Sequence, residues 1–239
     1  MISVDFLKKL ANKHQTTELN IRREYIQHLF LSYFYQRPEA DKIYFKGGTA
    51  LRVVYGSPRF SEDLDFSSSY KQIRPIENAV IDSLREIERE GIDTEIVESK
   101  KTSGGYLAII NFRISGEKVS TQLEISLRGK KEKGEVVSIV GDFTPPYTIL
   151  VLEKEQLVGE KIQALLFRQK PRDFYDLYFI LRANFLPARE KNILPLVLKI
   201  LHESKTNFEQ ELKQFLPKSQ WAIILEFRKA LEKEIIKFK

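Results

Sequence analysis

The 239-residue sequence contains no cysteine, and it has only three histidines, one methionine and one tryptophan. The absence of cysteine excludes disulfides, thiolate metal centres and thiol nucleophiles. Imidazole is available only from His14, His28 and His202, so a zinc enzyme is not expected. A chain of this length can bury a substantial core, and neither disulfides nor structural metals are needed to stabilise it.

Long apolar runs are also missing. No uncharged apolar stretch approaches the roughly 18 residues that a membrane helix needs. The first residues, with Asp5 close to the start, lack the apolar core of a secretory signal. We therefore expect a globular cytoplasmic protein with no membrane partner.

Positive charge is in modest excess and is unevenly distributed. The formal net charge is +6, and residues 151–239 carry 17 basic against 12 acidic side chains. Such a bias attracts polyanions such as RNA, DNA or nucleotides, although a net charge this small is common in proteins that bind none of them. Charge alone does not decide the partner.

Hydrophobic spacing predicts helices first, then a mixed α+β segment, then helices again. Apolar residues at three- and four-residue spacing predict two helices within 3–36, and a stripe that ends at Gly91 predicts a helix over 76–90. Shorter β-prone stretches predict strands at 42–45, 60–67, 94–98, 106–114 and 118–128. The basic segment 130–133 is expected to be a loop.

After residue 150 the pattern is helical, most clearly at 153–168 and 173–182. We place a domain boundary near residue 150, with an α+β domain over 1–150 and a helical domain over 151–239.

A glycine pair marks the first candidate site. Gly47, Gly48 and Thr49 lie between a predicted strand and a short predicted helix. Glycine lets the backbone approach a ligand closely, and the first N–H groups of a helix, together with the Thr49 hydroxyl, are suited to phosphate oxygens. Taken alone, the same residues also fit an ordinary turn from strand to helix.

Two carboxylates follow in the sequence Ser61-Glu-Asp-Leu-Asp-Phe66. Asp63 and Asp65 alternate with Leu64 and Phe66, so on a strand both acids point the same way. Like charges this close are costly unless a cation neutralises them, and hard oxygen ligands favour magnesium or manganese. Exposed surface acids are the alternative. A phosphate-binding turn beside paired carboxylates is what phosphoryl or nucleotidyl transfer requires.

Glu124 is the best candidate for a third carboxylate. It lies on the polar side of a predicted strand whose other side carries Leu123 and Ile125. It would act as general base for an attacking hydroxyl, alone or while sharing the metal. An exposed acid on the polar face of a sheet is an equally good reading of the pattern.

These motifs, with Arg172-Asp-Phe-Tyr-Asp-Leu177, resemble the AbiEii/AbiGii nucleotidyltransferase toxin family over roughly residues 40–185. The resemblance implies an α+β fold with a DNA polymerase β-like nucleotidyltransferase core, a mixed β-sheet, N-terminal helices and a C-terminal helical domain. It also implies magnesium-dependent use of NTP.

The resemblance further implies catalytic roles for Lys161, on a predicted helix, and for Asp173, with Asp176 nearby. Lys161 suits a triphosphate as a point cation, and Asp173 and Asp176 share a helical face from which they would orient Lys161 or contact the nucleotide. A solvated lysine and a structural salt bridge to Arg172 or Arg168 are the alternatives.

Aromatic and basic neighbours complete the candidate set. Tyr175 and Tyr178 are available for stacking on a base. Arg52 and Arg59 bracket the two motifs and are within reach of phosphate, but surface arginines near acids usually form weak solvated pairs. His28 falls on an apolar stripe and is expected in the core.

The leading hypothesis is a nucleotidyltransferase that binds NTP between its domains, with Asp63, Asp65 and Glu124 on Mg²⁺ or Mn²⁺. By resemblance, the acceptor is the 3′ end of a tRNA, and the protein is the toxin of a toxin-antitoxin or phage-defence system with a cognate antitoxin partner. Two alternatives remain: transfer to a small-molecule or protein hydroxyl, and a nucleotide-binding module without catalysis.

Overall fold

The structure, a computed structural model, describes residues 2–127 and 133–238, so most of the predicted loop over 130–133 lies outside the described residues. The chain divides into two compact units. One comprises residues 1–56 and 60–153, and the other comprises residues 57–59 and 154–239. The chain therefore enters the second unit briefly between the two candidate motifs and enters it finally close to residue 150.

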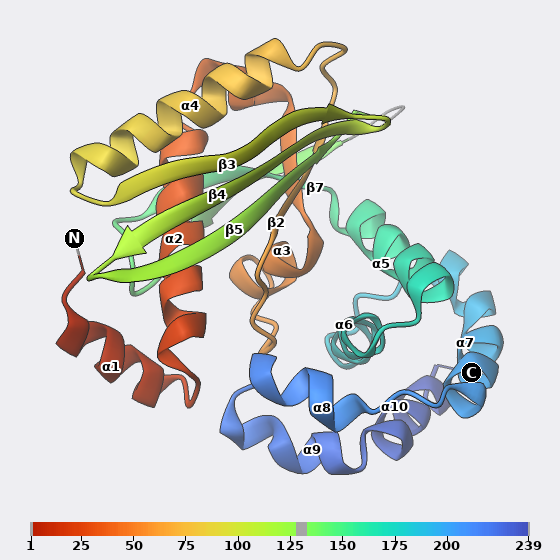
Figure 1. Cartoon of the computed structure of the whole chain (residues 1–239). Helices are drawn as coiled ribbons and strands as arrows, with labels where there is room; N and C mark the ends of the chain where they lie inside the picture. The colour runs from red at the N-terminus through yellow and green to blue at the C-terminus, as the bar shows by residue number, and fades with distance from the viewer. Residues whose placement is uncertain (1, 128–132, 239) are drawn as a thin grey trace. The chain divides into compact units, whose positions relative to one another are not determined.

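The first unit is built on a mixed sheet, which has seven strands among the described residues, in the order β3-β4-β5-β2-β1-β7-β6 (Figure 1). Strands β2 and β5 pair in parallel, as do β1 and β7, and the other pairs are antiparallel. The strands are β1 Ile43–Lys46, β2 Leu64–Ser68, β3 Asp93–Thr102, β4 Gly105–Ile114, β5 Glu117–Ser126, β6 Gly134–Ile139 and β7 Tyr147–Leu152.

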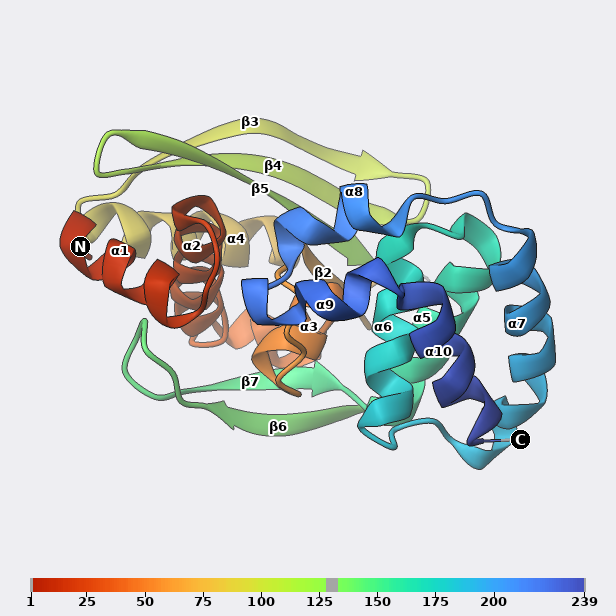
Figure 2. The same ribbon diagram turned by 90° about the horizontal axis from the view of Figure 1, so that it is seen from below.

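Helices α2 (Glu18–Phe34) and α4 (Arg74–Arg89) pack against each other and against this sheet, and Figure 2 shows α2 between β5 and β7. Thr17 caps α2 by accepting the Asn20 N–H. The ring of Phe34 on α2 packs on that of Phe66, which in turn contacts Phe45. Because side chains alternate along a strand, burying Phe45 and Phe66 turns their neighbours Lys46 and Asp65 to the opposite face.

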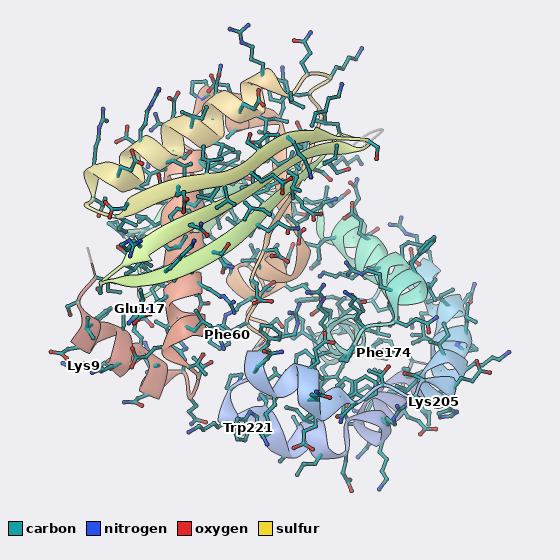
Figure 3. The ribbon with its side chains drawn as sticks, in the orientation of Figure 1. Lys9, Phe60, Glu117, Phe174, Lys205 and Trp221 are labelled. Atoms are coloured by element: carbon teal, nitrogen blue, oxygen red, sulfur yellow. The ribbon has the colours of Figure 1, made fainter. Side chains whose placement is uncertain are left out.

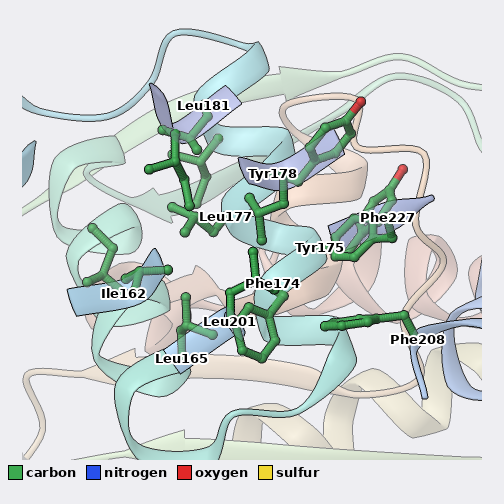
Figure 4. Close-up of a cluster of buried hydrophobic side chains, with 14 of the residues drawn as sticks. Ile162, Leu165, Phe174, Tyr175, Leu177, Tyr178, Leu181, Leu201, Phe208 and Phe227 are labelled. Atoms are coloured by element: carbon green, nitrogen blue, oxygen red, sulfur yellow. The ribbon is translucent and has the colours of Figure 1, made fainter. Parts of the chain in front are cut away.

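The second unit is helical. Its helices are α5 Lys154–Arg168, α6 Pro171–Arg182, α7 Leu194–Glu203, α8 Phe208–Leu212, α9 Trp221–Leu225 and α10 Phe227–Ile236. The core is aromatic around α6, where Phe174 contacts Phe208, and Tyr175 stacks on Phe227 (Figure 4). Among the described residues, no helix is both long enough and apolar enough to cross a membrane.

Most predicted elements are present, with two corrections. The N-terminal helices, the helix before Gly91 and the hairpin at Ser115-Gly116 all form. The β6–β7 hairpin, however, was not predicted, because its residues lie beside a Pro-Pro pair that suggested a break into helix. Strand β2 begins at Leu64, so Asp63 precedes the strand instead of lying within it.

Candidate active site

The glycine turn joins β1 directly to the short helix α3 (Gly47–Val53). Gly47 has a φ of +83°, in the region that favours glycine. A Cβ added at Gly47 would lie 2.1 Å from Oδ2 and 2.7 Å from Cβ of Asp65. The turn therefore needs glycine for two reasons, its backbone conformation and the close approach of the Asp65 carboxylate.

Asp65 lies at the centre of a row of polar side chains across three strands. Its register partners are Lys46 on β1 and Glu124 on β5. Residues opposite each other in neighbouring strands point to the same face of a sheet. The predicted juxtaposition of Asp65 and Glu124 on adjacent strands is confirmed. The predicted proximity of Asp65 to the glycine turn is confirmed as well.

Asp63 is held by its backbone at the entrance to β2. The Thr49 hydroxyl donates a hydrogen bond to the Asp63 carbonyl, and the neighbouring Glu62 pairs with Arg23 of α2 at 2.7 Å. Thr49 is fully buried, and a hydroxyl has one hydrogen to donate. As the side chains stand, that hydrogen is used within the protein, where Thr49 fixes Asp63 against the glycine turn. A bond from Thr49 to phosphate stays a prediction.

Glu124 is exposed on β5, and its Oε1 accepts a hydrogen bond of 2.5 Å from Nε2 of Gln122, two residues earlier on the same face. As the side chains stand, no three acidic or imidazole groups in the described parts of the chain surround a common point as metal ligands would. The metal roles of Asp63, Asp65 and Glu124 therefore stay predictions.

The loop that leads to Asp63 is supported from α2. Gln27 donates a hydrogen bond of 2.9 Å to the carbonyl of Ser61. Arg52 binds Glu24 through two nitrogens, at 2.6 and 3.0 Å, and its guanidinium lies 3.4 Å from the ring centre of Phe60. The alternative reading of Arg52, as a phosphate ligand, is not supported, because its guanidinium is committed to this buried pair.

In the second unit, Asp176 joins two cations. It accepts hydrogen bonds from Arg59 Nε at 2.8 Å and from Lys161 Nζ at 2.7 Å, and its side chain is almost fully buried. Burial by itself raises the pKa of Asp176, but the attraction of Arg59 and Lys161 outweighs it and lowers that pKa to about 2. Asp176 is therefore the residue that orients Lys161, as predicted for it or for Asp173.

Asp173 has a different role. One of its oxygens accepts a bond of 2.6 Å from Arg168, and the other accepts the backbone N–H of Lys170, which caps the start of α6. It is buried, and within the described residues its hydrogen bonds go to Arg168 and Lys170. Lys161 bonds to Asp176 instead. The structural alternative for Asp173, a salt bridge to Arg168, is the one observed, and the predicted catalytic role of Asp173 has no support in these contacts.

Tyr175 and Tyr178 are only 2% and 5% exposed. Their rings contact each other and Phe227 in the helical core (Figure 4). The prediction that they stack on a base is wrong, because the apolar stripe of α6 that carries them faces inward.

Three residues near the predicted motifs were missed or set aside. Lys46 shares the sheet face of Asp65, and Gln122 holds Glu124. Both had a signal in the sequence: Lys46 lies directly before Gly47, and Gln122 lies two residues before the recognised acid Glu124. Arg59 was set aside, and its partner Asp176 is 117 residues away, a pairing that no local pattern indicates.

Comparison with solved structures shows first that the fold is a known one. The fold matches that of MenT4, a nucleotidyltransferase toxin from Mycobacterium tuberculosis H37Rv, with a TM-score of 0.72 at 14% identity over 100% of this chain and 90% of that one. It also matches JHP933 from Helicobacter pylori, with a TM-score of 0.64 at 22% identity over 93% of this chain and 94% of that one. Among curated proteins, a search finds no match.

The family follows from the sequence itself. Residues 29–236 match the family model described as nucleotidyl transferase AbiEii toxin, type IV toxin-antitoxin system. The chain belongs to this family, and it is a nucleotidyltransferase of the toxin class. The α+β fold class predicted from the sequence is confirmed.

Proposed function

We propose that this protein transfers a nucleotidyl group from an NTP to the 3′ end of a tRNA, with a divalent metal ion, as a toxin that a cognate antitoxin restrains and that serves in phage defence. The observation that carries the proposal is the row Lys46, Asp65 and Glu124 on one sheet face, with Asp65 against the side-chain-free Gly47. The toxin class and the antitoxin partner agree with the family.

Asp63, Asp65 and Glu124 would hold the metal ion. All their donors are carboxylate oxygens, which suit Mg²⁺ or Mn²⁺, and all three residues are at least partly exposed to solvent. When bound, the ion supplies neutralisation of the phosphate charge. The hydrogen bond to the backbone of Asp63 and the close packing of Asp65 on Gly47 support the choice of these two residues as ligands.

The chain's own residues then act on the acceptor. The acceptor hydroxyl oxygen forms a bond to the α-phosphorus as the bond to the β-phosphate oxygen breaks, and pyrophosphate leaves. Glu124 takes the hydroxyl proton, with Gln122 holding its carboxylate in place. In the helical unit, Lys161 has donors left after its bond to Asp176, and we assign it to the triphosphate.

The test is transfer of label from each α-labelled NTP, with magnesium, to total tRNA, to protein and to a metabolite extract. Labelled tRNA supports the proposal, whereas label only in protein or metabolites supports the alternative acceptors, and no label supports a binding module. Glu124→Gln should lower the rate by roughly 100-fold or more, because a general base contributes that much.

The matched control is Glu117→Gln. Glu117 is an exposed acid at the start of the same strand, outside the part of β5 that pairs with β2 (Figure 3). We expect transfer by this variant at the wild-type rate. Equal rates for the two variants would reject Glu124 as the base.

A further inference from the structure

A large apolar side chain lies in the solvent at the end of α5. Phe167 is 92% exposed, the highest value for a large hydrophobic residue among those described. One turn earlier on the helix lie Gln163 and Ala164, which leave the ring uncovered. Exposing a phenyl ring to water forgoes the stabilisation of burial. Single exposed apolar side chains are common, so the residues beside the ring decide whether it serves a partner.

The turn after Phe167 is basic. Residues 168–172 read Arg-Gln-Lys-Pro-Arg, with no acid among them. The acid that follows, Asp173, is buried and matched to Arg168. Lys170 is exposed, and neither it nor Arg172 forms an ion pair with an acid among the described residues. The positive charge of Lys170 and Arg172 therefore remains available to an anion.

Arg172 carries a second signal. Its Nε is buried and has no hydrogen-bond partner within the described part of the chain. An unsatisfied buried donor costs free energy, and an anion placed to accept from Nε itself would remove that cost. Arg172 also binds phosphate well because its planar donors match phosphate oxygens.

The turn is rigid enough to present these groups. Gln169 adopts a left-handed φ of 54° in the turn where the chain changes direction between α5 and α6 (Figure 1). Asp173 fixes the residues on both sides of Gln169, because its carboxylate accepts hydrogen bonds from Arg168 at 2.6 Å and from the Lys170 N–H at 3.2 Å. Phe167, Lys170 and Arg172 are thus held by a fixed turn instead of a long loop, which lowers the entropic cost of binding.

We propose that this turn, residues 167–172, is a binding site for unpaired nucleotides of the RNA acceptor, a base stacking on Phe167 while Lys170 and Arg172 bind the flanking phosphates. An exposed aromatic ring beside cations is the combination that binds single-stranded nucleic acid. A base within a duplex offers no free face to such a ring. The inference rests on the proposed function, because it assumes that the acceptor is RNA.

The site is tested by RNA binding without NTP, so that its outcome is separate from that of the transfer reaction. Trp221, the single tryptophan (Figure 3), is replaced by Phe, and Phe167→Trp is introduced as a fluorescent reporter. A single-stranded RNA dodecamer should quench the new tryptophan, while the blunt duplex of the same sequence should quench it much less.

Phe167→Ala should weaken binding of the single-stranded dodecamer by roughly 5- to 150-fold, the effect of losing one base stacked on an aromatic ring. Phe167→Trp should retain the affinity. Lys170→Gln should reduce the slope of log K against log salt by about 0.7, as expected for one phosphate contact to a single strand. The matched control is Leu225→Ala, which removes a 71% exposed apolar side chain of the same unit. It should leave the affinity for the single-stranded dodecamer unchanged.

Unchanged RNA affinity in Phe167→Ala would overturn the inference even if tRNA is labelled by the wild type. The inference would also be overturned if Phe167→Ala abolished self-association of the chain but left RNA binding intact, because the surface would then serve a protein partner. Conversely, quenching by RNA in a protein that labels no tRNA would uphold the binding site and reject the proposed acceptor.

Discussion

Replacing Gly47 by Ala tests the closest contact of the candidate active site. Two effects are expected. An alanine at a φ of +83° costs about 1–2 kcal/mol of folding free energy. Its Cβ would also overlap the Asp65 side chain, with separations of 2.1 Å to Oδ2 and 2.7 Å to Cβ and Cγ. Because Cβ and Cγ lie near the root of a short side chain, Asp65 must move as a whole.

A displacement of about 1 Å in a reacting group lowers a rate by roughly 100-fold. We therefore expect Gly47→Ala to fold, to lose at least about 1–2 kcal/mol in urea unfolding, because the overlap with Asp65 adds to the backbone cost, and to lose nearly all transfer of label from NTP.

Gly116→Ala provides the control. Gly116 has the same φ of +83°, but a Cβ at that position would have no heavy atom within 4 Å. Gly116→Ala should show only the loss of stability that comes from the backbone conformation, with transfer unchanged. If Gly47→Ala is as active as Gly116→Ala, the packing of Asp65 on the turn does not matter for the reaction, and the argument for the site fails.

Two further predictions concern buried charge. Asp176→Asn should destabilise the helical unit by about 3–5 kcal/mol in urea unfolding, because it leaves Arg59 and Lys161 buried without their anion. Since the folded pKa of Asp176 is lowered to about 2, its contribution should be present above pH 4 and be lost between about pH 4 and 2, a decline that the variant should not show. Burial lowers the pKa of His28 to about 4. Between pH 6.5 and 4 the unfolded chain therefore binds a proton at His28 that the folded chain does not bind, and the free energy of unfolding should fall by about 3 kcal/mol over this range. His28→Gln, which keeps a partner for Tyr147, should flatten that decline, and an equally steep one in the variant would contradict the assignment.

The first half of the site was predictable from the sequence because its parts are close along the chain. Gly47 directly follows β1, which pairs with β2, the strand that carries Asp65. Glu124 was also found, because an acid on the polar side of an apolar strand is visible in the alternation even though its partner is far away. Alternation does not reveal side-chain conformations, so the hydrogen bond from Gln122 to Glu124 was not predicted.

The helical half was less predictable. Period-3.6 spacing located α6, but the choice between Asp173 and Asp176 depended on tertiary partners that are distant in sequence. The position of Asp173 three residues after Lys170 does suggest a helix cap. The tyrosines of α6 were assigned to a ligand although their spacing equally fits a core stripe, and the core is where they lie. The family resemblance pointed to this segment, but tertiary packing determines that Asp176 binds Lys161 and that Asp173 binds Arg168.

The three residues Ser57–Arg59 belong to the helical unit although they sit in sequence between α3 and β2. A gene fragment that begins at Lys154 would lack Arg59, and its product would keep Asp176 with one cation instead of two. A fragment ending at Glu153 would carry Arg59 without its acid. The two units are therefore not interchangeable modules, and recombination or protease cleavage at their junction would damage both products.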